Sequence, residues 1–296
     1  MVIFLVSACE VNRPVRTETV EPIQSPIPTN TITPVPPTPI PTPIPMAAMV
    51  NSEGITIEEY EAELSRYRAA LEGGQPQNDQ EAGLLVLEDL INQVLLAQGA
   101  IEEGFLLGEE ALQVQLNTLI TAAGGQEKFK KWLQENEFTQ ESFNKTLKRS
   151  ILGALMRDHI LAEVPLSAEQ VNVQQILLYN IDQANQVLTE LESGREFATL
   201  AAIYEPVTQG NLGWFPRDFL PHPLIEEAAF NLQPGEYSQV IETSVGFHII
   251  QVVERDPDHK LSPEARLIWK EKALQEWMAM QREQSDIVIL IQQQGE

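Results

Sequence analysis

The distribution of prolines constrains this 296-residue chain more than any other feature of its sequence. Eleven of its 20 prolines lie between Glu10 and Pro45. Proline fixes φ and lacks a backbone N–H donor, so this stretch can form neither a regular helix nor a central strand. We therefore predict a disordered linker over residues 10–46 that favours polyproline II and can extend on the order of 100 Å. A proline-rich ligand for a signalling domain is the competing interpretation.

The only cysteine, Cys9, ends the apolar segment that precedes this linker. Residues 1–8 carry no charge and are too few to span a bilayer, which requires about 20 apolar residues in a helix. They are typical of the apolar part of a signal peptide, although no basic residue precedes them. The stretch V-S-A-C that ends at Cys9 resembles the lipobox of bacterial lipoproteins. The resemblance implies a truncated lipoprotein signal segment over residues 1–9 with lipid attachment at Cys9; a free thiol is the alternative.

Composition excludes several classes of function. The net charge of −24, from 43 acidic and 19 basic residues, disfavours binding to nucleic acid and adhesion to anionic lipid. One cysteine excludes an intrachain disulfide framework and a cysteine-rich metal site, and the four histidines lack the spacing of metal ligands. The chain contains no G-x-G-x-x-G, P-loop or G-x-S-x-G motif. We expect no metal, no cofactor and no nucleic-acid partner.

Residues 47–166 show the apolar spacing of three and four that is typical of amphipathic helices. A strand or turn at residues 50–55 leads to Thr56, which we expect to be a helix N-cap because Glu59 follows at capping-box spacing. We predict further helices over residues 81–104, 108–123, 126–136 and 139–163.

Three stretches of this region, M-V-N-S-E-G-I-T-I-E-E-Y, L-I-N-Q-V-L-L-A-Q-G-A-I-E-E-G-F and F-K-K-W-L-Q-E-N-E-F-T-Q-E-S-F, resemble the helical chaperone module of the SurA/PrsA class of extracytoplasmic folding factors. The resemblance implies that the last segment, 258–296, returns to complete this module. It contains a predicted helix over residues 263–284 and a short strand after it. We expect Trp269 and Trp277 to belong to the core rather than to a peptide-binding platform.

Between residues 167 and 257 the pattern becomes that of an α/β domain. We predict a strand at 171–178, helices at 183–193 and 197–204, and strands at 238–241 and 246–254. Four stretches, S-G-R-E-F-A-T-L-A, Q-G-N-L-G-W-F, I-E-E-A-A-F-N-L-Q-P-G-E-Y-S and T-S-V-G-F-H-I-I-Q-V, occur here in order. In this order they resemble a parvulin-type peptidyl-prolyl cis/trans isomerase. The fold class is therefore α+β: a helical SurA/PrsA-like module with an inserted parvulin-like domain.

The parvulin resemblance implies the residues of a site. The apolar pocket for a proline ring would consist of Leu212, Leu220, Ile225 and Phe230, and the polar floor of His248, Thr243 and Gln175. Leu220 and Ile225 replace the usual Met and Phe, with one extra residue between them. Gln175 stands in place of the second histidine of the family. If a polar floor survives, the Gln175 side chain should lie within hydrogen-bond reach of Thr243 or His248.

The resemblance implies a lipid-anchored, extracytoplasmic isomerase and chaperone, acting on unfolded polypeptides with X-Pro bonds. Residues 179–183 contain no Lys or Arg, which argues against phosphopeptide specificity. Gln175 and a short loop at 204–209, in which Glu205 is a poor substitute for the usual Asp or Cys, favour the alternative of a non-catalytic holdase. A tethered solute-binding lipoprotein is a third interpretation, against which the parvulin resemblance argues.

Overall fold

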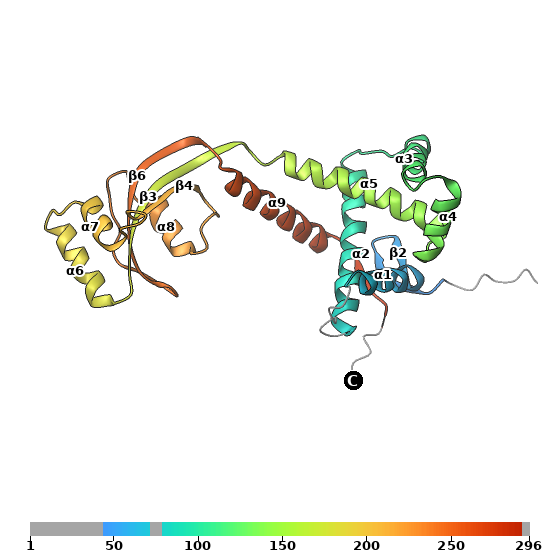
Figure 1. Ribbon diagram of the computed structural model, residues 1–296, viewed down its shortest axis with the longest axis horizontal. Helices are drawn as coiled ribbons and strands as arrows, with labels where there is room; N and C mark the ends of the chain where they lie inside the picture. Colours follow the sequence, from blue (N-terminus) through green and yellow to red (C-terminus); the bar gives the residue numbers. More distant parts are fainter. Residues whose placement is uncertain (1–43, 72–78, 292–296) are drawn as a thin grey trace, which may run out of the picture. The chain divides into compact units, whose positions relative to one another are not determined.

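The computed structural model describes residues 44–71 and 79–291 of the chain (Figure 1). The predictions for the signal segment, for Cys9 and for most of the proline-rich linker lie outside these residues. The described residues form two sheets with helices around them, so the predicted α+β class is confirmed.

The described part begins with a hairpin, β1 (Met46–Val50) and β2 (Glu53–Thr56), followed by α1 (Ile57–Ala70). The prediction of one strand or turn at residues 50–55 was wrong in detail. Two strands pair there, and Asn51, with φ of 54°, makes the turn between them. The predicted N-cap is confirmed, because the Thr56 side chain accepts a hydrogen bond of 3.0 Å from Glu59 N.

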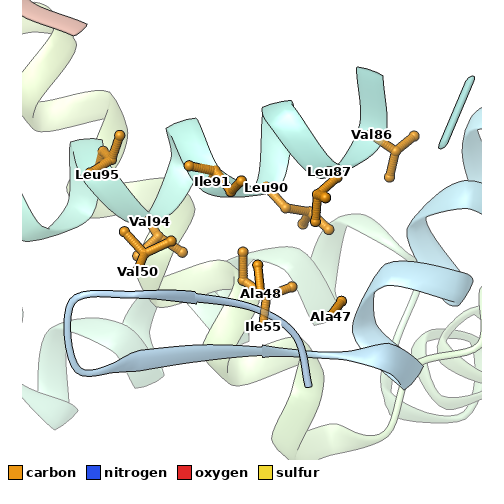
Figure 2. Close-up of a cluster of buried hydrophobic side chains, with 10 residues drawn as sticks. All are labelled: Ala47, Ala48, Val50, Ile55, Val86, Leu87, Leu90, Ile91, Val94 and Leu95. Carbon is orange, nitrogen blue, oxygen red and sulfur yellow. The ribbon is translucent and has the colours of Figure 1, made fainter. Parts of the chain in front are cut away.

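The longest helix of this part, α2 (Asp79–Glu102), lays an apolar face on the hairpin (Figure 2). Ile91 and Val94 are fully buried against Val50 and Ile55. This helix is long and apolar enough to cross a membrane by length and composition. Leu87, Leu90, Ile91, Val94 and Leu95 of this helix are buried in a protein core.

Three further helices complete the N-terminal part: α3 (Glu109–Ala122), α4 (Gln126–Glu135) and α5 (Gln140–Ala162). Each agrees with its predicted range within two residues. The aromatic rings of Phe129, Trp132, Phe138 and Phe143 pack against one another where α4 meets α5. Thr139, the first residue of the predicted helix, is the N-cap of α5 and forms a capping box with Ser142.

The C-terminal segment returns to the N-terminal helices, as expected. Trp277 of α9 (Pro263–Gln284) packs with Leu152 and Met156 of α5, as expected of a core residue, whereas Trp269 lies outside the buried clusters. Both rings also line a groove beside α5. The strand β7 (Ile287–Ile289) pairs antiparallel with β1, and the first sheet has the order β2-β1-β7. Residues more than 230 positions apart in sequence therefore close one module.

The segment between α5 and α9 forms the second sheet, of order β4-β3-β6-β5, in which all neighbours are antiparallel. Its elements are β3 (Ser167–Leu178), α6 (Ile181–Glu192), α7 (Phe197–Tyr204), β4 (Asn211–Pro216), α8 (Pro223–Asn231), β5 (Ile241–Thr243) and β6 (Gly246–Lys260). Helices α6 and α7 cover one face of the sheet, and α8 covers the other.

Several elements of this segment differ from the sequence prediction. The strand predicted at 171–178 begins at Ser167, and β4 and α8 were not predicted. The strand predicted at residues 238–241 begins only at Ile241. Before it, Tyr237 forms an isolated bridge and Ser238 N bonds to Ile250 O, but these contacts do not form a continuous ladder. The last strand continues to Lys260, beyond the predicted domain end at 257, because Lys260 pairs with Ser167. The sequence did not indicate this extension of the strand, because the stretch D-P-D-H-K is polar.

A buried arginine joins α5 to the hairpin and α1. Arg149, whose side chain is 3% exposed, donates to Glu59 Oε1 at 2.5 Å and to Glu53 Oε1 at 2.7 Å. Glu59 also accepts from Lys145 Nζ at 3.0 Å. Glu59, the glutamate at capping-box spacing, thus forms ion pairs with α5 and does not bond to the N-cap backbone.

We expect Glu59→Ala to lower the free energy of unfolding by about 3 kcal/mol, because it leaves the buried Arg149 guanidinium with one carboxylate partner. Urea titration followed by far-UV circular dichroism measures this loss. The matched change Glu135→Ala removes only an exposed pair with Lys131 and should cost less than about 0.5 kcal/mol. Equal losses in the two variants would contradict a structural role for the Arg149 pairs.

Candidate active site

The alternation of side chains along the strands brings the candidate residues to one face of the second sheet. Val171 and Val173 of β3 and Ile250 and Val252 of β6 point toward α8 and pack with it. Gln175 and His248 have the same parity as these residues and therefore point to the same face. Because Leu177 pairs with His248, Gln175 lies two residues along β3 from the position opposite His248.

Gln175, His248 and Thr243 form one hydrogen-bonded chain. Gln175 Oε1 lies 3.2 Å from His248 Nδ1, and Thr243 Oγ1 lies 2.9 Å from His248 Nε2. Because the amide oxygen can only accept, Nδ1 carries the proton. The Thr243 hydroxyl bonds to Nε2 and also donates to Gly246 O at 3.2 Å. The expected contact of Gln175 with the floor is present in this geometry.

The threonine is fixed by the turn between β5 and β6. Val245 N donates to Thr243 Oγ1 at 3.2 Å, and Gly246 O lies 3.2 Å from the same hydroxyl. Gly246 has φ of 145°, and a Cβ at this position would lie 2.6 Å from Leu178 O. Only glycine permits this close approach of the turn to β3.

A second glycine fixes the Gln175 end of the hydrogen-bonded chain. Gln175 N donates to Gly210 O at 2.7 Å, and Gly210 has φ of 73°. A Cβ on Gly210 would lie 2.1 Å from Gln175 O, which no other residue type could accommodate. The glycine in the sequence stretch Q-G-N-L-G-W-F thus holds the backbone beside the Gln175 side chain.

The four predicted pocket residues lie in one apolar cluster on the same face of the sheet. Ile225 and Phe230 of α8 are buried, whereas Leu212 of β4 and Leu220 of the following loop are half-buried. Phe215 completes the cluster, with its ring edge toward Phe230 at a centroid distance of 6.3 Å. The structure therefore brings together all seven candidate residues of the sheet domain on the α8 face.

Sequence reasoning gave no role to Glu226, which organises the loop that carries Leu220. Its carboxylate accepts hydrogen bonds from the backbone N–H groups of Asp218, Phe219 and Leu220 at 2.6, 2.9 and 3.1 Å. Three such bonds hold a loop that has no regular structure of its own. The only sequence signal was the position of Glu226 in the stretch I-E-E-A-A-F, which marks α8 but not this contact.

A second histidine also escaped the sequence prediction as a site residue. His222, at the N-cap of α8, has its ring 6.2 Å from the ring of His248. Burial lowers the pKa of His248, which is 3% exposed, and repulsion from His222 lowers this pKa further. The neutral form of His248 is thus favoured.

Other features of the loop and of the histidines limit the chemistry of the site. Glu205 ends α7 as its C-cap, and among the described residues no hydrogen bond joins its carboxylate to His248. Over residues 44–71 and 79–291, no group of three or more His, Cys, Asp or Glu side chains could hold a metal ion. The arrangement offers a fixed polar chain beside an apolar surface.

Two family models match successive parts of the chain. Residues 39–157 match the SurA-like N-terminal domain, and residues 159–254 match the PPIC-type PPIase domain, also called rotamase. The first match covers the linker end and the helices α1 to α5, and the second covers the sheet domain up to the middle of β6.

Curated relatives agree with both matches. The chain is 29% identical to a chaperone SurA of Albidiferax ferrireducens over 71% of its length, and 27% identical to a foldase protein PrsA of Halalkalibacterium halodurans over 60%. It covers 54% and 60% of these two proteins, respectively, and so spans little more than half of their length.

Among solved structures, a peptidylprolyl isomerase PrsA of Bacillus cereus aligns with a TM-score of 0.42 at 20% identity, covering 78% of this chain and 83% of that one. The family matches and the curated relatives together show which domains the chain contains. The chain therefore contains a SurA-like N-terminal domain followed by a PPIC-type PPIase domain, and it is similar over both to SurA chaperones and PrsA foldases.

Proposed function

We propose that this protein is an extracytoplasmic peptidyl-prolyl cis/trans isomerase and folding chaperone. The observation that carries the proposal is the hydrogen-bonded chain of Gln175, His248 and Thr243 beside the apolar cluster of α8. The similarity to a SurA chaperone and to a PrsA foldase agrees with it. Its substrates are unfolded polypeptides with X-Pro bonds, and residues 179–183 offer no cation for a phosphate.

The chemistry needs no proton transfer to substrate. Rotation about an X-Pro bond has a barrier of about 20 kcal/mol, and the planar amide loses its conjugation at the top of this barrier. A catalyst therefore has to bind the twisted amide better than the planar one. In this proposal, Leu212, Leu220, Ile225 and Phe230 hold the proline ring and exclude water from the amide.

The polar chain has a positioning role in this mechanism. Gln175 fixes the tautomer of His248, and His248 in turn directs the Thr243 hydroxyl. A preorganised hydroxyl and imidazole beside the apolar cluster stabilise the changed charge distribution of the twisted amide without reorganising. Glu226 contributes by holding Leu220 in place through the loop backbone.

We expect His248→Ala to lower the kcat/KM of the full chain for a short X-Pro peptide at least about tenfold, since it removes the centre of a buried hydrogen-bonded chain. Protease-coupled isomerisation and proline-limited refolding both measure this rate. His159→Ala, which changes a histidine of α5 that packs on Phe105, serves as the matched control. A wild-type chain without any acceleration would refute the isomerase proposal.

A second candidate function, a holdase, has its own support. A groove of about 650 Å³ is lined by residues of α5 and α9, among them Met156, Ile160, Trp269, Trp277 and Met280. Flexible Met side chains and aromatic rings suit apolar polypeptide segments of many sequences. This function does not depend on the polar chain, and Gln175 in place of an imidazole favours it.

We expect the double variant His248→Ala/Thr243→Ala to suppress aggregation of an unfolded client as well as the wild type does, because it leaves the groove intact. Met280→Asp should weaken this suppression without changing the isomerisation of a short peptide, since Met280 is exposed and lines the groove. Light scattering of a chemically denatured client measures the effect. Loss of suppression in the double variant alone would assign client binding to the sheet domain.

The proposal also includes a lipid on Cys9, which would attach the protein to the bacterial cell membrane. It is supported by the V-S-A-C stretch and by the proline-rich linker that follows. The acidic body avoids anionic lipid, so an acyl anchor supplies the membrane affinity that its own charge opposes.

We expect the chain, expressed in bacteria with a basic segment before Met1, to incorporate labelled palmitate and to sediment with membranes. Cys9→Ser should lose the label and release the protein, since only the thiol accepts the diacylglycerol. Adding Ser25→Cys to Cys9→Ser tests the context, because a thiol within the linker should stay unlabelled. Label retained in Cys9→Ser would contradict lipid attachment at this residue.

A further inference from the structure

Helix α9 packs on the helical module and also contacts a loop of the candidate active site. This site loop, residues 217–222, joins β4 to α8. Trp269 Nε1 of α9 donates to the carbonyl oxygen of Arg217 at 2.9 Å. One turn further along the helix, Lys272 Nζ lies 2.7 Å from Asp218 Oδ2. Two side chains of α9 thus bond to two consecutive residues of the site loop.

The position of α9 follows from the end of the β3–β6 ladder. Directly after the last pair of this ladder, Leu261 N donates to Leu166 O at 2.9 Å, and Ser262 then caps the helix. Trp269 and Lys272 are three residues apart and therefore lie on one face of α9. Because the start of the helix is tied to the sheet, this face carries both side chains to the site loop together.

Asp218 is held by two helices at once. Its backbone has φ of 59°, in the left-handed region that residues other than glycine adopt rarely. Its N–H donates to Glu226 of α8 at 2.6 Å, and its carboxylate pairs with Lys272 of α9. Lys272 Nζ lies farther from Glu276 of its own helix, at 3.7 Å. A rare backbone conformation persists where the surroundings fix it, and α8 and α9 both supply fixing groups for this one.

The site loop connects these contacts to the apolar pocket. The guanidinium of Arg217 lies over the ring of Phe230, 4.2 Å from its centroid. Two positions after Asp218, the half-buried Leu220 packs in the same apolar cluster. Arg217 and Leu220 therefore contact the pocket on either side of the residue that pairs with α9. A shift of the loop backbone at this residue would displace both side chains.

We propose that Trp269 and Lys272 are positioning residues of the apolar pocket, which act through the site loop on Leu220. Without them, the loop keeps its bonds to Glu226 but loses its attachment to α9. A loop with fewer contacts opens locally more often, so Leu220 spends less time in its place. The pocket then binds a proline ring less tightly. That this binding serves catalysis rests on the isomerase function proposed above.

Three substitutions in the full chain test the contact. Trp269→Phe keeps an aromatic ring and removes the N–H donor. Lys272→Met keeps the length of the side chain and removes its charge, and Lys272→Arg restores a cation. Lys270→Met is the matched control, because it makes the same change in the same helix at a lysine that lines a separate groove with Leu166 and Leu261.

The first measurement is the dissociation constant for a short X-Pro peptide, obtained by NMR titration. We expect Trp269→Phe to raise this constant about two- to tenfold, since it removes one hydrogen bond that orders the loop. Lys272→Met should raise it less, about two- to fivefold, because the ion pair is partly exposed, and Lys272→Arg should recover most of the loss. Lys270→Met should bind the peptide as the wild type does.

Two further readouts separate positioning from a general loss of stability. In the active enzyme, a looser pocket raises KM with little change in kcat, whereas a smaller folded fraction lowers kcat at unchanged KM. The amides of residues 218–220 donate to Glu226, and we expect their hydrogen exchange to be several-fold faster in Trp269→Phe than in the wild type or in Lys270→Met.

Unchanged peptide affinity in both Trp269→Phe and Lys272→Met would overturn the proposal. Faster amide exchange together with unchanged affinity would overturn it as well, because α9 would then hold the loop without positioning the pocket. If the wild type binds the peptide but does not accelerate its isomerisation, the isomerase function fails, and weaker binding by the two variants still supports the positioning role. A wild type without measurable affinity for the peptide would refute both.

Discussion

The antiparallel pairing of β3 with β6 is the interaction on which the rest of the second sheet depends. At one end Ser167 pairs with Lys260, so the chain enters and leaves the sheet domain at neighbouring positions. Toward the other end Leu177 pairs with His248, and this register places the Gln175 side chain beside the imidazole. A slip of one residue would turn every side chain of one strand to the opposite face. The same ladder thus defines the insertion and assembles the site.

The apolar cluster and the polar chain of the site depend on each other. Buried polar groups are costly unless each has a partner, and His248 has one on each ring nitrogen. The cluster around Phe215 and Phe230 keeps water away from that chain. Two guanidinium groups lie over the Phe230 ring, Arg217 at 4.2 Å and Arg255 at 5.8 Å from its centroid. Arg255 also bonds to the carbonyls of Phe230 and Leu232, which fixes the end of α8.

Much of the fold could be predicted from the sequence because its helices have strong local signals. The N-cap at Thr56 and the apolar spacing of α2 and α5 located these helices to within a few residues. The strands β4 and β5 and the extension of β6 were harder, since their pairing depends on partners distant in sequence. From the sequence alone Lys260 is expected in a polar loop, and only its pairing with Ser167 shows that it belongs to a strand.

The site, like the fold, could be predicted only in part from the sequence. The family resemblance supplied His248, Thr243 and the apolar residues, and strand alternation explains why they share one face. The contacts of Glu226 and His222 could not be predicted, because both depend on how an irregular loop folds back on α8. Neither residue lies at a spacing that a helix or strand period would reveal.

The hydrophobic cores of the chain are separate, and this separation explains how the site can vary. The clusters under α8 and under α6 and α7 contain only residues of the sheet domain, whereas the clusters around α2 contain residues 47–107 and 152–160 with residues of α9 and its C-terminal continuation. Substitutions at positions that share no partners have nearly additive effects on stability. A change at position 175 therefore acts first on the core of the sheet domain. The groove of the helical module is less independent, because Asp218 of the site loop lines it and pairs with Lys272 of α9 at 2.7 Å, and Trp269 Nε1 donates to Arg217 O at 2.9 Å.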